Sequence, residues 1–249
     1  MSIIRPVLAL LLALAAQLLH AQPLTVSAAA SLSDAFREIG KAFEATRHGV
    51  VVRFNFAASG VLLQQIAQGA PVDVLASADA ETMQRAQERK LIDAATRRDF
   101  AANTLVLVTP LADAVGIKAL ADLRHPAVRR IALGKPASVP AGRHARSALE
   151  QAGLLPLLEP RLVPADSVRQ ALDYVARAEV EAGFVYRTDA IALPDRVRIV
   201  QPVAGTGPIR YPAAVVSDSR HQPLAREFVQ FLASDTAQQI LARLGFGRP

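Results

Sequence analysis

Two short segments place a serine among small residues where a strand is expected to give way to a helix. Ala28–Asp34 reads AAASLSD, with Ser31 behind three alanines, and Phe56–Gly60 reads FAASG, with Ser59 behind two. The first backbone N–H groups of a helix are unpaired and carry a partial positive charge, and a serine adds a hydroxyl donor. Small neighbours let a ligand approach closely. The chemistry that this pattern offers is capture of an anion by uncharged hydrogen-bond donors.

Three further positions offer donors of the same kind. The run VPAG puts a proline and small residues at an expected helix start and leaves the backbone N–H of Ala141 open. The run DSVR begins another helix, in which the side chain of Val168 can pack in the core while its N–H faces a ligand. Tyr186 ends an apolar strand and offers a phenol. Each position also fits an ordinary structural role, such as an N-cap at Ser31 paired with Asp34, so the residues alone leave both interpretations open.

An enzyme is the alternative from a different class of function. A serine nucleophile needs a base beside it, and the sequence has no G-x-S-x-G elbow and no histidine near Ser31 or Ser59. The chain contains no cysteine, which excludes a thiolate nucleophile and a cysteine metal site. The histidines beyond the N-terminal segment are scattered without metal-ligand spacing: His48, His125, His144 and His221. We therefore expect neither catalysis nor a cofactor.

The elements that must position these donors alternate between strand and helix. Short apolar or β-branched runs are followed by helical patterns, which predicts an α/β fold whose sheets are mainly parallel and flanked by helices. Ligands bind such sheets at the carboxyl ends of the strands. The expected strands are 24–30, 50–56, 72–76, 104–108, 130–133, 182–186, 197–200 and 211–216. The expected helices are 33–46, 61–68, about 141 to 153, 167–178, 223–232 and 235–244.

No long linker interrupts this alternation. Two lobes without a linker are expected to be joined by paired crossover strands, with a ligand cleft between the lobes. We assign residues 22–104 and 206–249 to lobe 1 and residues 105–205 to lobe 2.

The N-terminus has the layout of a secretory signal peptide. Arg5 supplies a positive charge, and Val7–Ala16 is an apolar run too short to span a membrane, which takes ~20 apolar residues. Cleavage after Ala21, which would remove residues 1–21, predicts a periplasmic protein, and the absence of a lipobox cysteine favours a free one. The net charge of +6 would steer anions toward the protein, whereas 5% aromatic residues and no tryptophan argue against a nucleic-acid surface.

The order of these pieces resembles, in sequence and spacing, the periplasmic molybdate-binding component of ABC transporters. The segments that carry the resemblance are AAASL (28–32), FAASG (56–60), GAPVDVLASAD (69–79), VPAG (139–142), DSVRQAL (166–172) and GFVYRTDA (183–190). Together they span essentially the whole chain after the predicted signal peptide. The sequence departs from the family near Ser59, where the family often has a hydroxyl-rich run and this chain has Ala58 and Gly60. The resemblance implies a two-lobed periplasmic binding protein of type II.

The resemblance also implies which residues hold the oxyanion. Ser31 and Ser59 would give hydroxyl and backbone donors, Ala141 and Val168 would give backbone N–H groups, and Tyr186 would give its phenol. The same residues would hold the metal of molybdate or tungstate through the oxygens of the anion. Sulfate or phosphate is the alternative ligand, disfavoured by cavity size. The implied partner is a membrane ABC transporter permease, and we expect a monomer that binds no nucleic acid.

Several basic residues lie beside the proposed donors and raise the question of a cationic cage. They are Arg143, His144, Arg146 and Arg169. We expect no such cage, because residues in the first turn of a helix usually point outward and helix N-termini disfavour added positive charge.

Overall fold

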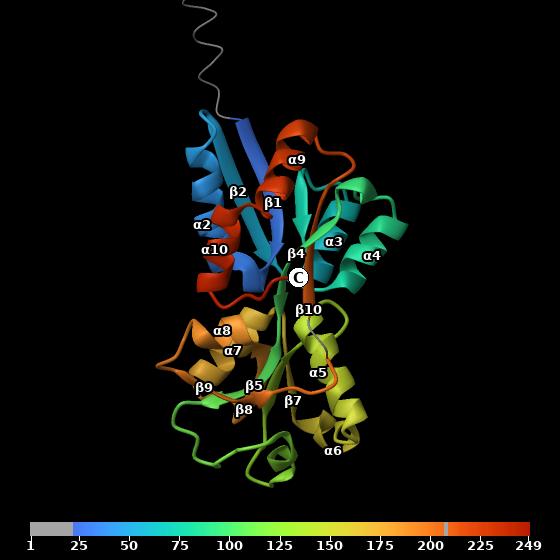
Figure 1. Ribbon diagram of the computed structural model, residues 1–249. Helices are drawn as coiled ribbons and strands as arrows, with labels where there is room; N and C mark the ends of the chain where they lie inside the picture. The colour runs from blue at the N-terminus through green and yellow to red at the C-terminus, as the bar shows by residue number, and fades with distance from the viewer. Residues whose placement is uncertain (1–21, 207–208) are drawn as a thin grey trace, which may run out of the picture.

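The computed structural model describes residues 22–206 and 209–249 and divides them into two lobes (Figure 1). The predicted signal peptide, residues 1–21, lies outside the described residues. Each lobe contains a sheet of five strands in the described ranges, with orders β2-β1-β3-β10-β4 and β7-β6-β8-β5-β9. Within those ranges, no helix has the length and apolar character needed to cross a bilayer.

Lobe 1 is built on the first of these sheets. Its strands are β1 (Gln22–Ala29), β2 (Val50–Ala57), β3 (Val74–Ala76), β4 (Arg98–Asn103) and β10 (Ile209–Val215). Its helices are α2 (Ser33–Ala45), α3 (Ser59–Ala67), α4 (Ala80–Glu88), α9 (Gln222–Phe231) and α10 (Asp235–Arg243), with short 3-10 turns η1 (Ala30–Leu32) and η2 (Ala94–Thr96).

Lobe 2 is built on the second sheet. Its strands are β5 (Leu105–Pro110), β6 (Ile131–Gly134), β7 (Leu162–Ala165), β8 (Ala182–Tyr186) and β9 (Val197–Pro202). Its helices are α5 (Pro140–Gln151), α6 (Leu155–Leu158), α7 (Val168–Ala176) and α8 (Arg187–Ile191), with 3-10 turns η3 (Leu120–Arg124) and η4 (Glu159–Arg161).

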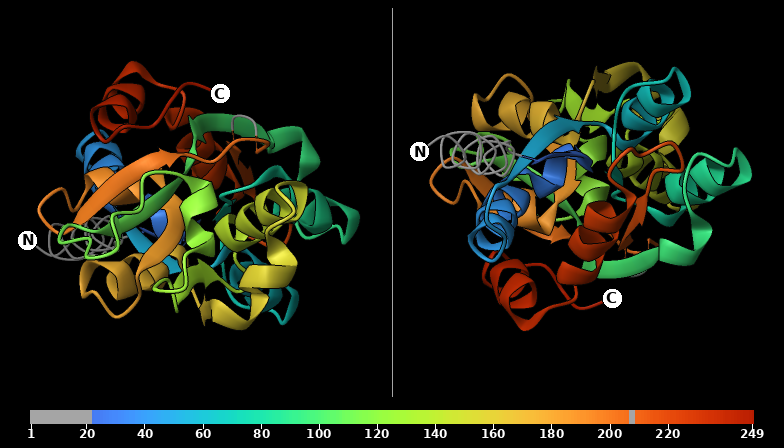
Figure 2. Two further views of the ribbon diagram at one scale, coloured as in Figure 1. Left: turned by 90° about the horizontal axis from the view of Figure 1, so that it is seen from below. Right: turned by 90° about the horizontal axis from the view of Figure 1, so that it is seen from above.

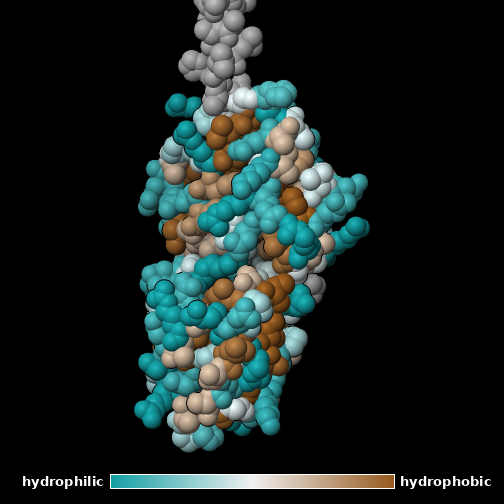
Figure 3. Space-filling view, turned by 90° about the vertical axis from the view of Figure 1, so that its left-hand side faces the viewer, coloured by the Kyte–Doolittle hydropathy of each residue, from teal (hydrophilic) through white to brown (hydrophobic). Residues whose placement is uncertain are grey.

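Helices cover both faces of each sheet, as the end-on views show (Figure 2). In lobe 1, Phe36, Ile39 and Phe43 of α2 are fully buried on one face, as their spacing predicted. A second cluster, which includes Leu62 of α3 and Met83 of α4, packs on the opposite face. Hydrophilic side chains predominate on the outer face seen in Figure 3, with scattered apolar areas in both lobes.

The chain crosses between the lobes twice. Strand β4 leads into β5 through Thr104 alone, and β9 leads back to β10. The two crossing segments run antiparallel, since β5 pairs with β9 and β4 pairs with β10. The C-terminal segment lies at this waist (Figure 1), where Gly247 pairs with Ala102 of β4. The predicted joining of the lobes by paired crossover strands is therefore confirmed.

The α/β class and the two-lobed arrangement are confirmed, although the sheets are mixed. In each sheet two strand pairs are parallel and two are antiparallel, and every antiparallel pair involves β10 or β5. The physical reason is the double crossing, because a strand that enters from the other lobe runs against its new neighbours. Strand β8 has the predicted bounds, whereas β4, β7, α4, α6 and α8 were not predicted.

Candidate functional site

The five residues singled out in the sequence line one small cavity between the lobes. Lobe 1 contributes Ser31 from η1 and Ser59, the first residue of α3. Lobe 2 contributes Ala141 from the first turn of α5, Val168 at the start of α7 and Tyr186 at the end of β8. The remaining lining residues are small or apolar: Ala29, Ala30, Ala57, Ala58, Ala78, Val139 and Pro140.

The strand-to-helix junctions aim their first N–H groups at this cavity. Four buried backbone N–H groups there have no acceptor within the described residues: those of Ser31, Ser59, Ala141 and Val168. Buried N–H groups without a partner are rare in folded proteins, and each costs about 1–3 kcal/mol. Four of them around one small space indicate a site that is completed by an acceptor.

The N-cap interpretation of Ser31 is wrong. Ser31 lies in the middle of η1, the residue before α2 is Leu32, and no side chain caps that helix. Helices α3 and α5 likewise start without a side-chain cap, whereas Ser167 caps α7 by accepting the N–H of Gln170, which leaves the N–H of Val168 unpaired. The donors at the cavity are thus left free for a ligand.

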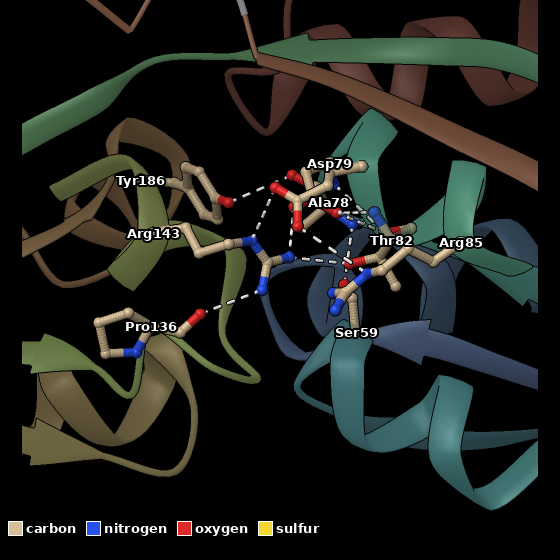
Figure 4. Close-up of polar contacts among 10 residues, drawn as sticks. Ser59, Ala78, Asp79, Thr82, Arg85, Pro136, Arg143 and Tyr186 are labelled. Carbon is tan, nitrogen blue, oxygen red and sulfur yellow. Dashed lines mark hydrogen bonds and ion pairs between the residues drawn. The ribbon is translucent and has the colours of Figure 1, made fainter. Parts of the chain in front are cut away.

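The backbone of Ala78 engages two of the hydroxyl groups. Ser59 Oγ accepts the N–H of Ala78 at 3.0 Å, so its own proton remains available. Tyr186 donates its hydroxyl across the cleft to the carbonyl oxygen of Ala78 at 3.2 Å (Figure 4). Burial raises the pKa of Tyr186 well above its ordinary value, so the phenol keeps its proton at neutral pH. An anion that takes this hydrogen bond must compete with Ala78.

The flanking arginines do not point outward as expected from the sequence. Arg143 reaches from α5 to Asp79 and Thr82 of lobe 1, where its Nη2 lies 2.5 Å and 2.9 Å from the two side-chain oxygens (Figure 4). Arg169 reaches from α7 to Asp34 of lobe 1 at 2.7 Å. First-turn side chains can point across a cleft when the opposite lobe supplies carboxylates. Neither arginine lines the cavity, whose lining residues are all uncharged.

Arg169 also pairs within its own lobe. Its Nε lies 2.8 Å from Oδ1 of Asp189, a fully buried carboxyl at the start of α8. Burial raises the pKa of Asp189 to about 6 against the opposing effect of Arg169. Burial acts to lower the pKa of Arg169, but the carboxylates of Asp189 and Asp34 outweigh it and raise the pKa above the ordinary value. The guanidinium is therefore charged and held by two carboxyls.

Sequence reasoning missed the residues that support the donors from behind. Ala78 and Asp79 follow β3, and a strand end in an α/β sheet was a signal that could have found them. Tyr211, whose hydroxyl lies 3.1 Å from Ser31 Oγ, comes from β10, far away in the chain. Such a contact has no local signal, because only the pairing of distant strands creates it.

Two α/β lobes joined by paired crossings, with a donor-lined cavity between them, define a two-lobed ligand-binding protein of the periplasmic type. The chain belongs to the bacterial extracellular solute-binding protein family, whose sequence pattern matches residues 24–247.

Relatives and solved structures agree with this membership. The chain is 37% identical over 229 residues to the molybdate-binding protein ModA of Escherichia coli, covering 90% of this chain and 88% of that one. It is 35% identical over 225 residues to the putative ABC transporter substrate-binding lipoprotein YvgL of Bacillus subtilis, covering 90% and 85%. The periplasmic molybdate-binding protein of Azotobacter vinelandii superimposes with a TM-score of 0.80 at 25% identity, covering 91% and 99%.

Proposed function

We propose that this protein captures molybdate or tungstate outside the cytoplasm and delivers it to a membrane ABC transporter permease. The observation that carries the proposal is the set of four buried, unpaired N–H groups around one small cavity between the lobes. The names of the relatives, which include molybdate-binding proteins, point to the same ligand.

Uncharged donors suit a permanently ionised oxyanion. Molybdate and tungstate offer acceptors on all sides and no proton, so every group that faces them can donate. The proposed contacts are the backbone and hydroxyl donors of Ser31 and Ser59, the N–H groups of Ala141 and Val168, and the phenol of Tyr186. These residues would hold the metal only through the oxygens of the anion. The N-termini of α3, α5 and α7 add a favourable dipole field without a formal charge.

The proposed capture step is closure of the two lobes around the anion. Residues 22–104 with 206–249 and residues 105–205 would move as two bodies about the crossings beside Thr104 and between β9 and β10. Since both lobes contribute donors, the anion has more contacts in the closed form than in the open one. This difference in affinity shifts the population toward the closed form, which the permease then recognises.

The cellular setting follows from the same proposal. The predicted signal peptide, residues 1–21, would direct export and be removed, which leaves a free periplasmic protein. It would act as a monomer, without nucleic acid and without catalysis, and its working partner would be the permease.

Titration calorimetry of the mature protein with four anions tests the proposal. Molybdate and tungstate should bind, and sulfate and phosphate should bind at least about tenfold more weakly, which corresponds to ~1.4 kcal/mol. Thermal unfolding provides an independent readout, because a ligand at 100 times its dissociation constant adds ~2.7 kcal/mol of stability. Sulfate or phosphate binding as tight as molybdate binding would replace the proposed ligand. No binding of any oxyanion would refute the proposed function.

A further inference from the structure

A buried chain of hydrogen bonds lies behind Ser31 and runs from lobe 1 into lobe 2. Ser31 Oγ lies 3.1 Å from the hydroxyl of Tyr211. The side-chain amide nitrogen of Asn103 lies 3.3 Å from that hydroxyl and 2.9 Å from Oγ1 of Thr188 in lobe 2. All four side chains are more than nine-tenths buried. The chain passes through Asn103, the last residue of β4 before the crossing.

A backbone group sets the orientation of the Asn103 amide. The N–H of Thr104 donates to Oδ1 of Asn103 at 2.9 Å, and a backbone N–H cannot reverse its role. The oxygen of the amide must therefore face Thr104, and the NH₂ group must face Tyr211 and Thr188. Its two protons match these two hydroxyl oxygens, so Tyr211 accepts a hydrogen bond from Asn103.

The hydroxyl of Tyr211 must also donate a hydrogen bond of its own. Burial raises the pKa of Tyr211 far above its ordinary value, so the phenol stays protonated and must donate. Two oxygens are close enough to matter: Ser31 Oγ, and the hydroxyl of Tyr186, whose ring packs against that of Tyr211 at 5.6 Å. A proton sent to Tyr186 would leave Ser31 donating to Tyr211 and turning a lone pair toward the cavity. A bound dianion would be repelled by that lone pair.

We propose that Asn103 and Tyr211 are positioning residues that hold the Ser31 hydroxyl with its proton directed toward the ligand. The proposal rests on the proposed function, since it concerns the polarity of the same cavity. Tyr211 donates to one of the two lone pairs of Ser31 Oγ when the anion is bound, and the Ser31 proton is then free to point into the cavity. The cavity consequently selects oxyanions that carry no proton.

This selection differs from selection by size. A protonated oxyanion of similar size, such as hydrogenarsenate at mildly alkaline pH, brings an O–H group that needs an acceptor. A Ser31 hydroxyl that directs its proton into the cavity presents no lone pair there to receive it. Without the Tyr211 hydroxyl, nothing holds the Ser31 proton toward the cavity, so the protonated anion should lose less affinity relative to molybdate.

The experiment compares molybdate and hydrogenarsenate binding by calorimetry in wild type and in Tyr211→Phe. The ratio of the molybdate affinity to the hydrogenarsenate affinity should fall by about tenfold in Tyr211→Phe. This is the expected effect of giving the buried O–H group of hydrogenarsenate an acceptor. Tyr174→Phe, a partly buried tyrosine on α7, is the matched control and should leave the ratio unchanged. In a Ser31→Ala background, Tyr211→Phe should have no further effect on the ratio, because Tyr211 acts through Ser31.

The outcomes separate this proposal from the proposed function. Wild type that binds neither anion contradicts the proposed function. If the wild type binds molybdate and Tyr211→Phe loses affinity equally for both anions, Tyr211 only supports the fold. That result would overturn the positioning role. If Tyr211→Phe does not fold, Asn103→Ser removes the amide that orders Tyr211 and should lower the ratio in the same way. An unchanged ratio in Asn103→Ser would then overturn the proposal.

Discussion

Arg143 and Asp79 form an ion pair that bridges the two lobes beside the cavity. Nη2 of Arg143 lies 2.5 Å from Oδ2 of Asp79, and the side chains are only 17% and 5% exposed. Asp79 also caps α4 by accepting the N–H of Thr82 at 3.0 Å. On the other side of the cleft, Arg169 pairs with Asp34. Since each pair joins residues of different lobes, both pairs stabilise the closed arrangement.

Arg143→Gln should weaken molybdate binding by about ten- to hundredfold. Breaking a largely buried ion pair costs up to about 3 kcal/mol, because the remaining carboxylate of Asp79 stays desolvated when the lobes close. Opening the cleft lets water reach Asp79, so the change should act on closure more than on folding of either lobe. Calorimetry measures the affinity, and small-angle X-ray scattering measures the shift toward the open form.

Arg146→Gln is the matched control for that experiment. Arg146 lies one turn along the same helix and, among the residues that the structure describes, forms ion pairs only with Glu150 and Glu159 of its own lobe. The affinity of the Arg146→Gln variant for molybdate should match that of the wild type. A loss of affinity as large as that of Arg143→Gln would show that a general loss of positive charge, and not the bridge, matters.

Gly60→Ala should obstruct closure by direct contact between backbones. A Cβ at Gly60 would lie 2.7 Å from the carbonyl oxygen of Ser138 in lobe 2, where the Gly60 N–H now donates at 3.0 Å. We expect at least about tenfold weaker molybdate binding with little change in the unfolding midpoint of the ligand-free protein. Gly247→Ala, where a Cβ meets nothing closer than 3.7 Å, is the control. Wild-type affinity in Gly60→Ala would mean that this approach is not needed for binding.

Tyr186→Phe should lower molybdate affinity by about tenfold or more. The substitution removes the single phenolic proton, which Tyr186 donates to Ala78 in the structure and would donate to the anion in the complex, and a hydrogen bond to a charged group contributes about 1.5–3 kcal/mol. Calorimetry measures the affinity, and Tyr174→Phe again serves as the control. An affinity equal to that of wild type would exclude Tyr186 from the donor set.

The stability contribution of Asp79 should disappear in acid. Burial acts to raise the pKa of Asp79, but Arg143 and the hydrogen bonds from Thr82 and Arg143 outweigh it and hold the pKa below 3.8. The folded state therefore binds fewer protons than the unfolded state, so the contribution is present above about pH 4 and is lost as the pH falls through the folded pKa. Urea unfolding of wild type and Asp79→Asn should show a stability difference at pH 7 that shrinks toward pH 3. A difference independent of pH would contradict this assignment.

The sequence by itself determined the elements whose signals are local. The spacing of Phe36, Ile39 and Phe43 predicted α2, and the apolar run before Tyr186 predicted β8 with its observed bounds. The candidate donors were recognisable because small residues at strand-to-helix junctions leave N–H groups unpaired. Charged or polar elements escaped prediction, as with β4 (Arg98–Asn103), because they lack an alternating apolar pattern and depend on distant partners for their pairing.

Only the tertiary structure decided how those donors are arranged and oriented. Chain order does not reveal that Arg143 faces a carboxylate of the other lobe, so the sequence predicted that it points outward. Nor does it reveal that Tyr211 and Asn103 stand behind Ser31, since three separate strand pairings bring them there. Local propensity sets which N–H groups are free. Packing of distant segments sets where they point, and buried hydrogen-bond partners set which oxygen donates.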